Sequence, residues 1–145
     1  MGISVKVNIR ELVEFGRTIE NLKEAPGRIS AELALTTLRL VAEGFAREAD
    51  PEGRGWAPRV VEVAGRDPGR PILVLTGRMK ASFRIIRANA RGFVVGTSVR
   101  YAGYHQRGTK RMARRSMVPL TGRVPAAWQQ EWERVATEVL ERAVG

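Results

Sequence analysis

The sequence has no cysteine and a single histidine, and these shortages exclude most common catalytic and metal-binding arrangements. Without cysteine the chain has no disulfide, no thiolate nucleophile and no Cys-ligated zinc site. One histidine, His105, cannot form a histidine metal cluster, and a serine triad built on it would lack the G-x-S-x-G signature. Neither glycine-rich phosphate-binding motif occurs. We therefore expect no enzyme activity, no cofactor and no metal.

Long hydrophobic runs are also missing, so the sequence predicts no transmembrane helix and no membrane partner. With 145 residues, 43% hydrophobic and 28% charged, the composition is typical of a globular protein. The length fits one domain, residues 1–145. Within it we distinguish an N-terminal part with a strand and helices (1–67), a basic β-rich block (68–124) and a C-terminal helix (125–145).

Acidic side chains are absent from residues 68–130, where 13 basic side chains lie. This block accounts for the whole excess of the net charge, +10, and 21 of the 25 basic residues of the chain are arginine. Arginine suits bidentate contacts with carboxylate or phosphate. The block indicates an anionic partner, which is nucleic acid, an acidic protein face or the acidic parts of neighbouring copies. The alternative is that the arginines only solvate strand faces.

Hydrophobic periodicity predicts an α+β fold, a small antiparallel sheet packed against two or three helices. In the helix predicted at 29–49, Ala34, Leu38, Val41 and Phe45 form one stripe, flanked by Leu35. Leu33 and Leu40 lie outside this stripe. We expect them either to be exposed singly or to contact another subunit. The predicted strands are 3–9, 83–88 and 93–96, with a hairpin turn at 89–92, and the other predicted helices are 10–25, 78–83, 101–107 and 125–143.

Three tryptophans are predicted to be structural anchors. Trp56 lies in a turn-rich linker between Gly55 and Pro58, where a large aromatic side chain usually fills a cleft in its own domain. Trp128 and Trp132 share the apolar face of the C-terminal helix.

A long basic loop, residues 107–123, follows an aromatic turn and shows neither helical nor strand periodicity. A run of this length is either functional or disordered, and we expect it to become ordered on assembly. For His105, a hydrogen-bonded packing role is favoured over that of a base. The predicted subunit or partner interface consists of Tyr101, Tyr104, His105, Arg107, Lys110, Arg111, Arg114, Arg115 and Arg123.

Several short motifs occur in a characteristic order along the chain. They are DPEG at 50–53, GWAP at 55–58, LTGRM at 75–79, Ser82, VGT at 95–97, YA at 101–102, YHQ at 104–106 and Gly108. From about residue 10 to 125 their order and spacing resemble the phage virion morphogenesis family, the tail completion proteins. Residues 114–122 depart from that family's pattern, because Pro119, Leu120 and Gly122 are present but the usual aromatic residue is not.

The resemblance implies a non-enzymatic component of the head–tail neck, in the virion and in the host cytoplasm during assembly. Such proteins complete the tail or join it to the head, generally as rings, here a homo-oligomer for which we favour a hexamer over a dodecamer. The implied partners are neighbouring neck, connector or tail-tube proteins, and DNA passing through the lumen. The alternative is a small basic domain that binds nucleic acid without sequence specificity, which would release DNA steeply as salt rises.

Overall fold

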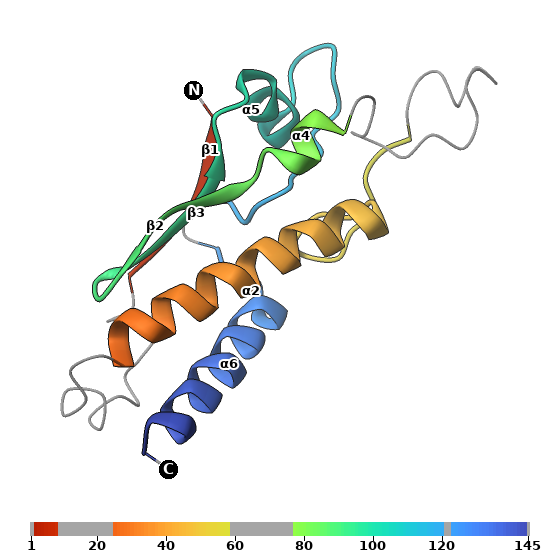
Figure 1. The fold of residues 1–145 in the computed structure, drawn as a ribbon. Helices are drawn as coiled ribbons and strands as arrows, with labels where there is room; N and C mark the ends of the chain where they lie inside the picture. Colours follow the sequence, from red (N-terminus) through yellow and green to blue (C-terminus); the bar gives the residue numbers. More distant parts are fainter. Residues whose placement is uncertain (1, 9–24, 59–76, 121–122, 145) are drawn as a thin grey trace.

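The computed structural model describes residues 2–8, 25–58, 77–120 and 123–144, which form a three-stranded sheet and four helices (Figure 1). This confirms the predicted α+β class. Residues 10–24 of the helix predicted at 10–25 lie outside the described residues, and Ala25 is the first residue of the next helix. In chain order the elements are β1 (Ile3–Asn8), α2 (Ala25–Arg47), α4 (Arg78–Ala81), β2 (Arg84–Asn89), β3 (Gly92–Thr97), α5 (Arg100–Arg107) and α6 (Ala126–Val144).

The sheet is antiparallel throughout, with strand order β1-β3-β2. The predicted hairpin joins β2 to β3, and β1 pairs on the other side of β3. Val5 and Ile85 both lie opposite Val95, which is completely buried. Because side chains alternate along a strand, Phe93 points to the same inner face as Val95, and it too is buried. The inner face of β3 therefore forms part of the hydrophobic core.

A bulge in β2 changes the side of the sheet to which its arginine points. Ile85 pairs with Val95, but the next paired residue is Arg87, opposite Val94, so Ile86 is the extra residue. Strict alternation along the strand would place Arg87 on the same side as Ile85, but the bulge shifts the alternation by one residue and Arg87 lies on the other side. Arg87 is exposed, and Ile86 is 52% exposed.

Helix α2 lies between the sheet and α6, and contacts β2 and β3 on one side and α6 on another (Figure 1). A helix between two layers buries two stripes of its surface. Leu33 is consequently buried, whereas the sequence predicted that it was exposed or in contact with another subunit. Leu35, expected beside the buried stripe, is 54% exposed.

Trp132 of α6 joins all three layers. Its indole Nε1 donates a hydrogen bond of 3.0 Å to Oγ1 of Thr37 on α2, and both residues are fully buried. Its ring meets the ring of Phe93 on β3 edge to face, with centroids 5.9 Å apart. Trp128, one helical turn earlier, packs on it in the same way at 6.0 Å. The hydrogen bond and the ring contacts fix the position of α6 on the core.

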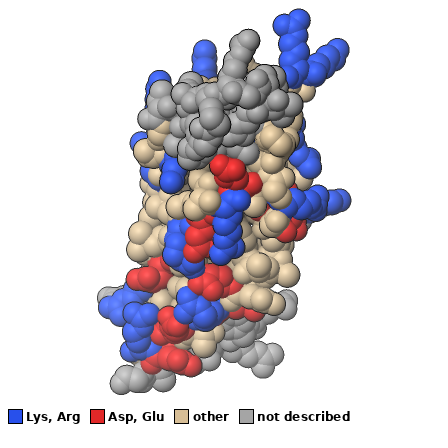
Figure 2. Space-filling model, turned by 90° about the vertical axis from the view of Figure 1, so that its right-hand side faces the viewer, with Lys and Arg blue, Asp and Glu red and all other residues tan. Residues whose placement is uncertain are grey.

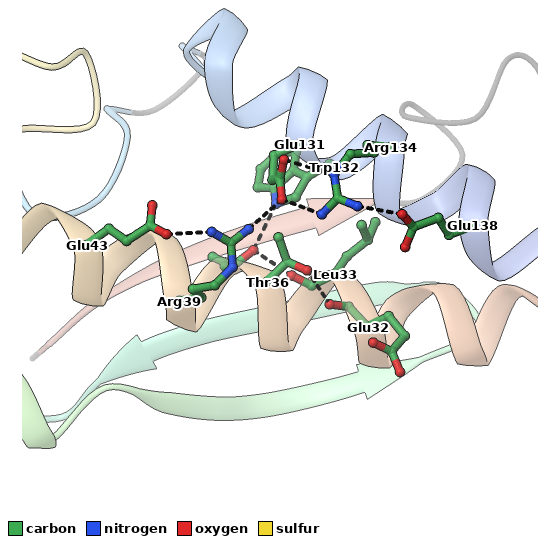
Figure 3. A network of polar contacts seen from close by, with 10 residues as sticks. Glu32, Leu33, Thr36, Arg39, Glu43, Glu131, Trp132, Arg134 and Glu138 are labelled. Carbon is green, nitrogen blue, oxygen red and sulfur yellow. Dashed lines mark hydrogen bonds and ion pairs between the residues drawn. The ribbon is translucent and has the colours of Figure 1, made fainter.

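An exposed network of ion pairs connects α2 to α6 outside this core (Figure 3). Arg39 contacts Glu43 on its own helix and Glu131 on α6, and Arg134 contacts Glu131 and Glu138. The hydrogen bond from Arg134, with help from Arg39, lowers the pKa of the Glu131 carboxyl. Exposed ion pairs contribute little free energy, so the network sets the register of the two helices more than their stability. Figure 2 shows acidic and basic side chains interleaved on one face.

Replacing Trp132 by alanine should destabilise the fold strongly, because it leaves a cavity and removes one of the two hydrogen bonds of the buried Thr37 hydroxyl, which keeps its bond to the Leu33 carbonyl. We expect Trp132→Ala to lower the free energy of unfolding by roughly 3–5 kcal/mol in urea denaturation. The control is Leu35→Ala, on the exposed side of α2, which should change it by about 0.5 kcal/mol or less. Equal losses in the two variants would contradict the central position of Trp132.

Candidate functional site

The segment that follows α5 is held against the body of the chain by the side chain of Gln106. Gln106 is 6% exposed, and its Oε1 accepts hydrogen bonds from the backbone N–H groups of Met117 and Val118, at 2.8 and 3.2 Å. Its Nε2 donates to the carbonyl of Val118 at 2.8 Å. One buried amide thus holds residues 117 and 118 on the body of the single chain, while the ordering of the loop on assembly stays a prediction.

Arg115 differs from the other cations of the predicted interface, because it is 9% exposed. Its backbone N–H donates to the carbonyl of His105 at 2.7 Å, and its guanidinium donates to the carbonyls of Ala57 and Pro58, both at 2.9 Å. The next carbonyl, of Ser116, accepts a 3.0 Å hydrogen bond from Nε1 of Trp56. Arg115 therefore ties the loop to the GWAP segment and does not face a partner.

Between these fixed points, residues 108–114 form a tight projection that we call the basic turn. Gly108 has φ of 74°, and a Cβ there would lie 2.9 Å from the backbone nitrogen of Arg114, so both the conformation and the close approach require glycine. Thr109 and Met112 pair through their backbones, with N–O distances of 2.9 and 3.3 Å. The exposed side chains of Lys110 and Arg111 stand at its tip.

The aromatic residues of α5 lie beside this turn. Tyr101 and Tyr104 are 38% and 54% exposed. His105 is half-buried, its ring edge to face with that of Tyr101 at 6.4 Å, and its buried Nδ1 has no hydrogen-bond partner in the described part of the chain. Burial, together with the positive charge of Arg115, lowers the pKa of His105. His105 thus packs on Tyr101 within α5, but its buried Nδ1 lacks the hydrogen bond that was expected of it.

The structure brings most of the predicted interface residues to one end of the molecule. Arg107 on α5 and Lys110, Arg111 and Arg114 in the basic turn are exposed. None of these four forms an ion pair with another described residue. Arg123 is also exposed but lies next to α6, outside the basic turn. Cations that have no carboxylate partner in the described part of the chain are available to an anionic partner.

Charge is divided between the two sides of the fold. The residues from Arg78 to Arg123 include α4, β2, β3, α5 and the basic turn, and contain no acidic residue. In the described chain the carboxylates lie on α2, in the turn after it and on α6. Sequence analysis placed the charge in the right block but did not identify the buried segment that holds the basic turn in place.

Within the described ranges no group of histidine, aspartate and glutamate side chains could hold a metal ion. In the same ranges, no helix has the length and apolar character needed to cross a membrane. A model of the phage virion morphogenesis family matches residues 7–137, which confirms the resemblance found in the sequence. No curated protein and no solved structure matches the chain.

Replacing Gln106 by leucine should release the segment 116–118. The substitution leaves two buried N–H groups and one carbonyl without their partner, so we expect roughly 2–4 kcal/mol less stability. Amide exchange at Met117 and Val118, followed by NMR, should lose its protection. Gln129→Leu, on the exposed side of α6, is the matched control and should leave both measurements unchanged. Protected amides in Gln106→Leu would mean that another contact holds the segment.

The lowered pKa of His105 predicts a pH dependence of stability. Since the folded pKa lies below the ordinary value of 6.5, the unfolded chain binds the proton first as the pH falls. The free energy of unfolding should therefore fall as the pH drops below about 6.5, until the folded pKa is reached. Urea denaturation from pH 7.5 to 5 should show this fall in the natural chain and a smaller one in His105→Gln. If the free energy of unfolding fell equally with pH in the natural chain and in His105→Gln, the prediction would be contradicted.

Proposed function

The chain belongs to the phage virion morphogenesis family, whose role is in phage structure and assembly, and we propose that it acts at the head–tail neck. There it would be a tail completion or head–tail joining subunit of a tailed phage or prophage, working in a ring of identical copies. The family match over residues 7–137 is the observation that carries this proposal.

The distribution of charge supports a ring. A subunit that has a basic projection on one side and carboxylates on another can contact its neighbour head to tail, and such contacts close into rings when the rotation allows. Complementary charges at such a contact set register and exclude wrong partners more than they add affinity. The basic turn provides one half of this arrangement, and the described carboxylates, which lie on α2, in the turn after it and on α6, provide the other.

Neighbouring layers of the neck are the other partners in this proposal. A connector or tail-tube protein with an acidic surface would suit the exposed arginines of the sheet and of α5, among them Arg87 and Arg100. The same exposed cations favour a second candidate function, non-specific binding of DNA that passes through the ring. The affinity for DNA would fall steeply as the salt concentration rises. A ring whose subunits bury apolar area would stay assembled at the same salt concentrations.

Deletion of the gene from the phage or prophage that carries it tests the proposal most simply. We expect full heads and separate tails in electron micrographs, and joined particles when the natural chain is supplied from a plasmid. The chain itself should be found in purified particles. Joined, infectious particles without the chain would contradict a neck function. If the particles join without the chain, the purified protein should be tested with duplex DNA. A monomer that binds DNA only at low salt would favour the second candidate function.

A further inference from the structure

A groove lies on the side of the fold that carries the carboxylates. It is formed by the second half of α2, the turn at residues 50–53 and the first turn of α6, and encloses about 170 Å³. This is several times the volume of about 30 Å³ that a water molecule takes up in the liquid, so the groove has room for a long side chain. Its apolar lining comes from Leu40, Met117, Ala127 and Trp128.

The rim of this groove is acidic. Glu43, Asp50 and Glu52 contribute three carboxylates and Arg47 one cation. Since Glu43 is already paired with Arg39, the excess of negative charge comes from Asp50 and Glu52. The turn that carries Asp50 is fixed, because its Oδ1 accepts a hydrogen bond from the backbone N–H of Arg54 at 2.9 Å. Its backbone N–H also donates to the carbonyl of Arg54 at 2.8 Å. An apolar floor with a fixed acidic rim suits a long side chain with a positive end, because such a side chain buries its stem and keeps its charge at the rim.

The basic turn has the complementary properties. Lys110 and Arg111 are exposed at its tip, and the neighbouring Met112 is half-buried, so the turn offers both charge and an apolar side chain. It stands beside α5, on the sheet side of α2, whereas α6 lies on the other side (Figure 1). Residues 108–114 are not among those that line the groove. The basic turn and the groove are thus two different surfaces of one chain.

We propose that the basic turn of one copy docks in the acidic-rimmed groove of the next copy. The inference rests on the proposed function, and names the contact between subunits in that ring. Because the two surfaces differ, the contact is head to tail and each copy both gives a turn and receives one. The backbone of the turn is held by the Thr109–Met112 pair in the single chain, so docking costs little backbone entropy and mainly the side-chain entropy of Lys110 and Arg111.

Cross-linking between single cysteines tests this contact, and the natural chain has no cysteine to interfere. Met112→Cys places a thiol at the basic turn and keeps its cations, and Ala127→Cys places one in the groove and keeps its carboxylates. The two variants are purified, mixed at a concentration at which native mass spectrometry shows rings, and treated with a short bismaleimide. We expect covalent dimers in the mixture and none in either variant alone.

The matched control replaces Ala127→Cys by Thr137→Cys, which is exposed on the same helix about 15 Å further along. Mixed with Met112→Cys it should give no dimer. Rings without a mixed dimer, or dimers of one variant alone, would overturn the docking but leave the ring function standing. If the chain stays monomeric at every concentration and is absent from particles, the proposed function fails and the inference with it.

Discussion

The position of the basic turn depends on one buried side chain, the carboxamide of Gln106. It satisfies the backbone of Met117 and Val118 in the interior, where unpaired amides would be costly. Arg115 is thereby drawn inward, and its guanidinium binds the carbonyls of the GWAP segment. With the end of the loop fixed in this way, residues 108–114 project as a defined turn. A partner therefore meets a preformed surface.

The layer order of the fold keeps the two charged surfaces apart. Helix α2 lies between the sheet and α6 (Figure 1). The chain continues from the sheet into α5 and the basic turn. Trp132 fixes α6 on α2 and on β3 through its hydrogen bond to Thr37 and its contact with Phe93. Because the groove is built from α2 and α6, the same packing that forms the core also shapes the acidic surface. In the proposed docking, stability and assembly would therefore depend on shared residues.

Periodicity predicted the α+β class, the β2–β3 hairpin and the long helix, because each has a clear pattern of its own. It did not predict that Leu33 is buried, since a helix that lies between two layers buries a second stripe of its surface, and its own periodicity does not show that it lies there. Nor could alternation along the strand give the bulge at Ile86, which puts Arg87 on the side of the sheet opposite to Ile85. The ordered segment 116–118 could have been suspected, because Gln106 falls on the buried side of α5 with Ala102 and precedes a short apolar run.

The central claim is that copies of this chain associate head to tail through the basic turn and the acidic groove. Single-particle cryo-electron microscopy of assembled particles tests it most directly. The account predicts a ring in which Lys110 and Arg111 of each copy lie within about 4 Å of carboxylates on the groove rim of the next. A ring in which every groove is open to solvent and the basic turns point at DNA in the lumen would contradict it.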